Sequence, residues 1–217
     1  MPLFKPDPPA PSTFAFRDGL RAFLAGPNFG EAGQLVSQAD LTADTPPSES
    51  DFSPPGGPWD HDPQQVFSLG LLDLKKGTGV TTARLVAWRY FAGDASGKVV
   101  LGTVIQRPAS GDWKLASVFY GYRVLRALVE SREIAQLDEV QAANYELRVL
   151  RIPGLNLEAF WLVAINAPVD LVAVFPAPPN QLIPQLNVSR VLTMTAFLGI
   201  VVPLATQRLT FPASTGS

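Results

Sequence analysis

The chain has 217 residues and a net charge of −2, with 47% hydrophobic and 17% charged side chains. This length and composition predict one globular domain with a packed core and argue against global disorder. The net negative charge argues against nonspecific binding to nucleic acid. The sequence has no cysteine, which excludes a disulfide framework, a zinc–thiolate site, an iron–sulfur cluster and a cysteine nucleophile.

Charge and proline are unevenly distributed along the chain. Residues 1–65 hold three basic and nine acidic side chains and twelve of the 21 prolines, whereas residues 66–217 hold fourteen basic and ten acidic side chains. The sequence therefore predicts an acidic, proline-rich arm over 1–65, a body over 66–185 and an apolar segment over 186–217. The opposite charges of arm and body favour docking of the arm onto the body or onto a neighbouring copy. A solvated tail is the other interpretation of the arm.

The first residues, MPLFKPDPPAPST, contain no uninterrupted apolar stretch of the kind found in a secretory signal peptide. A cytoplasmic location is therefore expected by default. A short helix is predicted over about residues 14–25, because Ser12 or Thr13 can cap it and Gly26-Pro27 ends it.

Four short strands with turn sequences between them are predicted at the start of the body. They are VFSLGLLDL, VTTARLVAWRYFA, VVLGTVI and WKLASVF, and their regular spacing is typical of an antiparallel meander. The apolar period then becomes helical, which predicts a helix from about Tyr120 to about Leu137.

A hairpin is predicted next. Tyr145, Leu147 and Val149 alternate with polar residues, which indicates a half-buried strand. Pro153-Gly154 fits the central pair of a type II turn. The following run, LNLEAFWLVA, becomes apolar on both faces and is predicted to be a central strand, and VDLVAVF is predicted to be another.

The stretch from Val191 to Gln207 contains no charged residue. A membrane anchor needs about 20 apolar residues, whereas this stretch is shorter and contains threonine, glutamine and proline. A buried helix or strand pair is favoured, with an apolar contact between copies and a membrane anchor as alternatives. The whole pattern predicts an α+β fold: a mainly antiparallel sheet of about six or seven strands, one long helix after the fourth strand, a short N-terminal helix and an apolar C-terminal segment.

The sequence NYELRVLRIPGLNLEAFWLVA, followed by VDLVAVFPAPP, resembles a pattern found in a family of uncharacterised bacterial proteins. The pattern consists of Tyr-Glu, then Leu-Arg-Ile-Pro, then an apolar run with Trp-Leu, then a proline-rich exit. The resemblance covers about residues 80–180. It implies no activity, no catalytic residue and no ligand.

Two short motifs are candidate sites. GDASGK, Gly93 to Lys98, has the wrong glycine spacing for a phosphate-binding loop and lies between two strands, so a hairpin turn is predicted. The only histidine lies in Asp60-His61-Asp62, a weak candidate for a metal site, with an exposed polar loop as the favoured interpretation. A single histidine and the absence of a GxSxG sequence argue against a Ser-His-Asp triad.

Paired carboxylates do acid–base chemistry without histidine, and Asp73, Glu146, Glu158 and Asp170 are the candidates. Glu146 and Glu158 flank the predicted hairpin, where they are expected either to approach each other or to pair with Arg148 or Arg89. Aromatic residues and arginines gather in the body, and a ligand site on the sheet face is predicted from them as an alternative to a core role. Its residues are Trp88, Arg89, Arg148 and Trp161.

These observations predict a non-enzymatic structural or interaction protein, a component of a homo- or hetero-oligomer that associates through residues 1–60 and 186–217. No cofactor is predicted, and no partnership with nucleic acid or membrane. The alternative is a small-molecule-binding module or an enzyme of unknown class with a pocket on the sheet face. A third hypothesis is a protein anchored in a membrane by its C-terminal segment.

Overall fold

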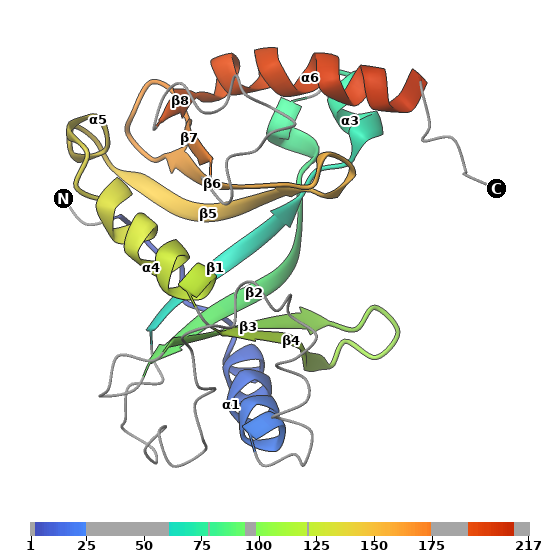
Figure 1. Cartoon of the computed structure of the whole chain (residues 1–217), viewed down its shortest axis with the longest axis vertical. Helices are drawn as coiled ribbons and strands as arrows, with labels where there is room; N and C mark the ends of the chain where they lie inside the picture. The colour runs from blue at the N-terminus through green and yellow to red at the C-terminus, as the bar shows by residue number, and fades with distance from the viewer. Residues whose placement is uncertain are drawn as a thin grey trace. The chain divides into compact units, whose positions relative to one another are not determined.

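The structure is a computed structural model that describes residues 3–24, 61–77, 79–93, 99–120, 122–174 and 191–210. In these residues eight strands follow the order β4-β3-β2-β1-β5-β6-β7-β8 (Figure 1). The β1–β5 ladder is parallel, and the ladders β2–β3, β3–β4, β5–β6, β6–β7 and β7–β8 are antiparallel. The fold is therefore α+β with a mainly antiparallel sheet, as the sequence predicts, and the sheet has eight strands where about six or seven are predicted.

The strands are β1 (His61–Ser68), β2 (Arg84–Gly93), β3 (Val99–Gln106), β4 (Trp113–Tyr120), β5 (Tyr145–Ile152), β6 (Leu157–Ala164), β7 (Leu171–Val174) and β8 (Leu192–Thr193). The helices are α1 (Ala10–Leu24), α3 (Leu71–Lys75), α4 (Tyr122–Ile134), α5 (Asp138–Gln141) and α6 (Met194–Thr210), with short 3-10 helices η4 (Gly79–Thr82) and η5 (Pro153–Leu155).

The chain forms two compact units. Unit 1 comprises Met1–Lys5, Gln65–Val86 and Glu133–Ser217, and unit 2 comprises Pro6–Gln64 and Ala87–Arg132. The chain therefore passes from one unit to the other four times. The division into arm, body and C-terminal segment remains a prediction about the sequence, and each unit is described below by itself.

The core of unit 1 lies between α6 and one face of the β5–β6–β7 strands, with α3 beside α6 (Figure 1). Helix α6 contributes one row of buried side chains, spaced three or four residues apart, as expected for a helix that covers a sheet with one face. These residues are Met194, Phe197, Val201 and Ala205. The uncharged C-terminal stretch is thus a helix with a buried face, the first of the predicted alternatives. No helix in the described part of the chain combines the length and the apolar character needed to cross a membrane.

The β5–β6 hairpin matches the prediction, but its turn does not. Pro153–Leu155 form a 3-10 helix, and the positive φ of 49° falls on Asn156. A type II turn at Pro153-Gly154 would have placed it on glycine. Asparagine tolerates this left-handed conformation better than most residues, which allows the helix to end there. Gly154 is needed for another reason: an added Cβ would lie 2.5 Å from Cδ1 of Leu71.

Two segments share one edge of β5. Residues Gln65–Ser68 of β1 pair in parallel with Arg148–Arg151. Beyond this ladder, Phe4 takes the neighbouring place: its N–H donates to the Tyr145 carbonyl at 2.8 Å, and its carbonyl accepts from the Leu147 N–H at 2.9 Å. The described start of the predicted arm is thus held by its own chain.

In unit 2, α1 covers one face of β3 and β4 (Figure 1). Phe16 and Leu20 of this helix are buried against Trp88 and Tyr90 of β2. The rings of Phe16 and Tyr90 stack with centroids 4.8 Å apart. The predicted N-terminal helix is present and begins four residues earlier than expected.

Helix α4 packs on the opposite face of the same strands. Val124 and Leu128 are buried against Phe91 of β2 and Leu101 of β3. Successive residues of a strand point to opposite faces. Tyr90 therefore contacts α1 on one face, and Phe91 contacts α4 on the other. The long helix predicted after the fourth strand is confirmed, and it begins about two residues later and ends about three residues earlier than predicted.

The first predicted strand differs most from the structure. The sequence predicts a strand beginning near Val66 and running through LLDL, whereas β1 begins at His61 and ends at Ser68, and Leu71–Lys75 form α3. The start of β1 was not predicted from the sequence because it contains Pro63 and two glutamines, which have no preference for strands. The five-residue α3 is too short for its period to separate it from a strand.

Candidate functional site

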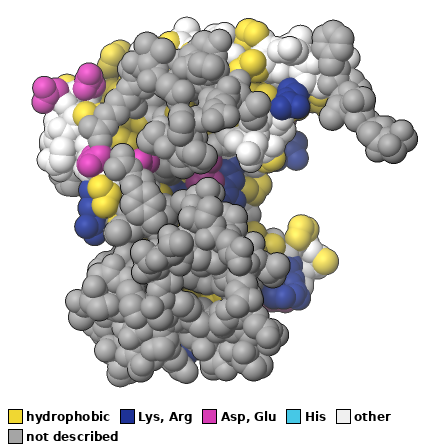
Figure 2. All heavy atoms as spheres, viewed as in Figure 1, with side chains coloured by type: hydrophobic (Ala, Val, Ile, Leu, Met, Phe, Trp, Pro, Cys, Tyr) yellow, Lys and Arg dark blue, Asp and Glu magenta, His cyan; other side chains and the backbone are white. Residues whose placement is uncertain are grey.

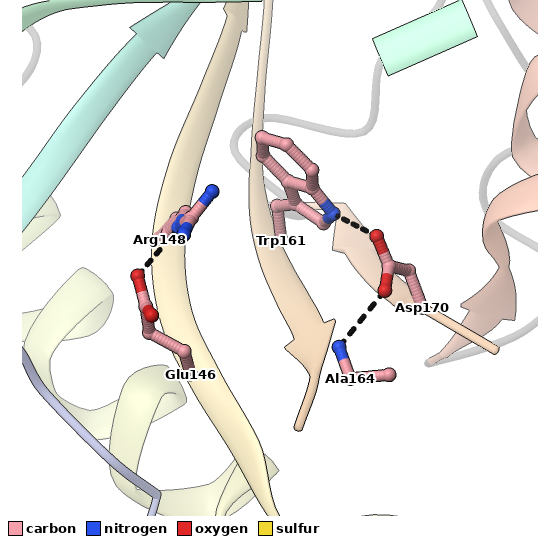
Figure 3. Close-up of polar contacts among 5 residues, drawn as sticks. All are labelled: Glu146, Arg148, Trp161, Ala164 and Asp170. Carbon is pink, nitrogen blue, oxygen red and sulfur yellow. Dashed lines mark hydrogen bonds and ion pairs between the residues drawn. The ribbon is translucent and has the colours of Figure 1, made fainter. Parts of the chain in front are cut away.

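A cluster of charged and aromatic side chains lies on the β5 and β6 strands of unit 1 (Figure 3). The Arg148 guanidinium lies 4.8 Å from the ring centre of Phe67 and 5.2 Å from that of Trp161, so it interacts with two aromatic rings. Its Nε donates to Oε1 of Glu146 at 2.5 Å. Arg148 and Glu146 are partly buried, with side chains 23% and 16% exposed. A partly desolvated, charge-paired arginine of this kind holds its guanidinium in one orientation.

The backbone explains this arrangement. Arg148 and Trp161 are direct cross-strand partners in the β5–β6 ladder, and Glu146 lies two residues from Arg148 on the same face. Phe67 of β1 meets the Trp161 ring edge-on, at a centroid distance of 5.6 Å. The strand register alone therefore brings these four side chains together.

Asp170 fixes the position of the Trp161 ring. Its Oδ2 accepts the indole N–H at 2.9 Å, and its Oδ1 accepts the backbone N–H of Ala164 at 2.8 Å (Figure 3). Both carboxylate oxygens are thus used to hold Trp161 and the end of β6. Burial raises the pKa of the neighbouring Tyr145 phenol, and the negative charge of Asp170 raises it further.

The two hairpin glutamates do not form an acid–base pair. Glu146 binds Arg148, whereas Glu158 accepts from Arg151 at 2.5 Å. Residues 146 and 151 differ by an odd number along β5, so the two ion pairs lie on opposite faces of the hairpin. The expectation that Glu146 and Glu158 approach each other is therefore wrong, and the alternative of a Glu146–Arg148 pair is confirmed.

A second polar cluster lies in unit 2, on the face of β2 and β3 that α4 covers. Gln64, Arg89 and Thr103 are buried there, with side chains 0%, 1% and 5% exposed. Nε of Arg89 donates to Oε1 of Gln64 at 2.8 Å, and Arg89 is the direct cross-strand partner of Thr103. These residues form a row across three adjacent strands, and we call them the polar row. Arg89 also lies over the Phe91 ring, 5.6 Å from its centre.

Nε2 of Gln64 and Oγ1 of Thr103 are among the buried atoms of the polar row that have no hydrogen-bond partner in the described residues. A buried polar atom without a partner destabilises a protein by about 1–3 kcal/mol, so such atoms call for an explanation. Sequence reasoning missed Gln64 and Thr103. Its only available signal was the pair of glutamines directly before the apolar Val66-Phe67.

The predicted ligand residues fall into two places. Arg148 and Trp161 are in contact in unit 1, whereas Trp88 and Arg89 belong to unit 2. Trp88 and Arg89 are consecutive in β2, so they face opposite sides of the strands, and Trp88 packs among the side chains under α1. The indole N–H of Trp88 has no hydrogen-bond partner among the described residues. A ligand-binding role for these four residues remains a prediction.

The weak metal candidate falls mostly outside the described part of the chain. Asp60 lies outside the described residues, and the side chains of His61 and Asp62, at the start of β1, do too. Among the residues that the structure describes, no three or more His, Asp or Glu side chains are grouped to hold a metal ion. The glycine-rich motif Gly93–Lys98 lies, apart from Gly93, outside the described residues.

Comparison of the chain with protein-family models, with curated proteins and with solved structures gave no match. The resemblance over residues 80–180 therefore stays a prediction.

Proposed function

We propose that the protein is a non-enzymatic interaction protein that associates with a second copy of itself through the exposed face of α6. The support is the character of that face. Helix α6 turns Thr195, Ala196, Gly199, Pro203 and Gln207 toward solvent, and all five are uncharged. In Figure 2 the described atoms along α6, at the top of the view, are mainly hydrophobic or uncharged.

A helix on a protein surface usually carries charged residues on its outer side. Here the charged residues nearest in sequence are Arg190 before the helix and Arg208 in its last turn. Charged residues are depleted in the centres of protein interfaces. An uncharged outer face on a helix whose inner face is already buried is therefore better suited to a protein contact than to water.

The backbone of α6 is open for close approach. A Cβ added at Gly199 would meet no atom within 4 Å. Pro203 lies four residues later and has no N–H, so the Gly199 carbonyl lacks its usual donor within the helix. This carbonyl is an acceptor that a hydroxyl or amide side chain from another molecule can satisfy. Thr195 and Gln207 on a second copy carry such donors.

A second copy is the simplest occupant of this face. An uncharged face meets itself without repulsion, and two-fold self-association is the commonest form of oligomer. The described parts of residues 1–60 contact their own chain instead, through Phe4 on β5 and through α1 on β3 and β4. The proposal therefore places the contact on α6 and not on the N-terminal arm.

The test is the solution mass of the full-length chain and two variants at Gly199, measured by light scattering after size exclusion. Gly199→Glu places a charge in the centre of the contact, and Gly199→Ala is the matched control. Both replace a helix-interior glycine, so each gains up to about 1 kcal/mol of helix stability over glycine. We expect dimers for the wild type and Gly199→Ala, and a monomer for Gly199→Glu. A monomeric wild type, or three equal masses, contradicts the proposal.

A further inference from the structure

We propose that the polar row of unit 2 is a binding site for a small carboxylate, whose oxygens accept hydrogen bonds from Gln64 Nε2 and Thr103 Oγ1. This inference concerns a different part of the chain from α6 and does not depend on self-association. It rests on the two buried atoms that lack partners and on the chemistry of the groups around them.

The orientation of the Gln64 amide is fixed by its neighbour. Arg89 has only N–H groups to offer, so the atom that accepts from its Nε at 2.8 Å is the amide oxygen. The other end of the amide is therefore an NH₂ group, which donates and does not accept. The side chain is fully buried, and Nε2 has no partner within the described chain. The group that completes this amide must be an acceptor.

Thr103 supplies the second open position. It lies directly opposite Arg89 in the β2–β3 ladder, so its side chain shares the face of Arg89 and Gln64. Its hydroxyl is buried without a partner among the described residues. A buried valine of the same shape would avoid this cost, so the hydroxyl is explained if it binds something.

The charge between the two donors selects the ligand. Arg89 is always protonated and is 1% exposed. Glu130, on α4, is also buried in this unit, and both residues make further interactions. The guanidinium places a positive charge between the two open positions, and both of these positions can donate a hydrogen bond. A carboxylate combines two acceptor oxygens with a negative charge, and it forms stronger hydrogen bonds than a neutral acceptor does.

The row also indicates a direction of entry. Thr103 is paired with Ser117 of β4, which is only half-buried, whereas Gln64 and Arg89 at the other end are closed to solvent. Burial thus decreases toward β4. Phe119 lies two residues from Ser117 on the same face and is 47% exposed. An apolar tail on the carboxylate fits this end of the row, so propionate and benzoate are better probes than acetate.

The experiment measures the thermal unfolding midpoint of the full-length protein in sodium acetate, propionate or benzoate, against sodium chloride at equal ionic strength. A ligand that binds only the folded state raises the midpoint with its concentration. Thr103→Val removes one donor and keeps the shape, and Thr81→Val, at an exposed position of η4, is the matched change outside the polar row and outside α6. We expect carboxylates to raise the midpoint of the wild type and Thr81→Val, and the apparent Kd for Thr103→Val to increase at least about tenfold.

A second variant distinguishes the loss of ligand binding from a failure to fold. Gln64→Glu keeps the acceptor for Arg89, removes the Nε2 donor and places a carboxylate of the protein itself at the site. We expect it to fold and to lose the response to added carboxylates. Equal responses in chloride and carboxylate for the wild type, or an undiminished response in Thr103→Val, would overturn the proposal and leave internal water as the occupant of the row.

Discussion

The backbone of Gly102 on β3 lies directly against the ring of Phe16 on α1. A Cβ added to Gly102 would come within 2.4 Å of Cε2 of Phe16 and 3.2 Å of Cδ1 of Leu115. The ring of Phe16 is itself fixed by stacking on Tyr90. The absence of a side chain at position 102 is thus what lets α1 reach the strands of unit 2.

Gly102→Ala is therefore expected to destabilise the protein. The new methyl group must displace α1 or force Phe16 from its place, which typically costs about 1–3 kcal/mol. Urea denaturation followed by circular dichroism measures the change. Gly199→Ala, where the added Cβ meets open space, is the control. An unchanged denaturation midpoint for Gly102→Ala would show that α1 does not pack on β3 as described.

The buried phenol of Tyr90 is expected to make the protein less stable at alkaline pH. Burial raises the pKa of its phenol, and hydrogen bonds with Ser12 and Thr13 oppose part of that rise. The Tyr90 oxygen lies 2.5 Å from Oγ of Ser12, which itself donates to the Pro9 carbonyl. Either hydroxyl can donate in the bond between Tyr90 and Ser12, and burial is the main cause of the raised pKa of Tyr90.

The direction of the effect follows from proton binding. Above about pH 10 the unfolded state releases the tyrosine proton, whereas the folded state retains it until its higher pKa is reached. The free energy of unfolding consequently falls as pH rises through this interval. Tyr90→Phe is expected to be less stable at neutral pH, by about 0.5–1.5 kcal/mol for the lost hydrogen bond. Its stability should also fall less steeply between about pH 10 and 11 than that of the wild type. Equal slopes for the two proteins would contradict a raised pKa at Tyr90.

Arg148 provides the third test. A lysine in its place keeps the positive charge but loses the flat guanidinium that lies against Phe67 and Trp161. We expect Arg148→Lys to lower the free energy of unfolding by about 1 kcal/mol. Arg151→Lys is the matched control, since Arg151 also pairs with a glutamate on the same hairpin. Equal losses for both variants would mean that the aromatic contacts contribute nothing beyond the ion pairs.

Local pattern was enough to predict the hairpin and the long helix. Tyr145 to Val149 alternate strictly, and this alternation alone places Arg148 on the face where Trp161 also lies. The parallel pairing of β1 with β5 was not predictable in this way, because the local pattern of apolar residues does not indicate which distant strands pair. Gln64 was missed for the same reason. Its role depends on Arg89, which reaches it only after β1 and β2 have formed.

The pairing of Phe4 with β5 sets an order of events during synthesis. The first residues of the chain leave the ribosome early, but their partners, Tyr145 and Leu147, follow only after most of the chain has been made. Gln65–Ser68 likewise wait for Arg148–Arg151. Contacts so distant in sequence close late and slow folding. Unit 1 therefore cannot be completed from the N-terminal half of the chain, and a ribosome stalled before the β5 codons would hold Phe4 and one edge of β1 without the strand that they pair with.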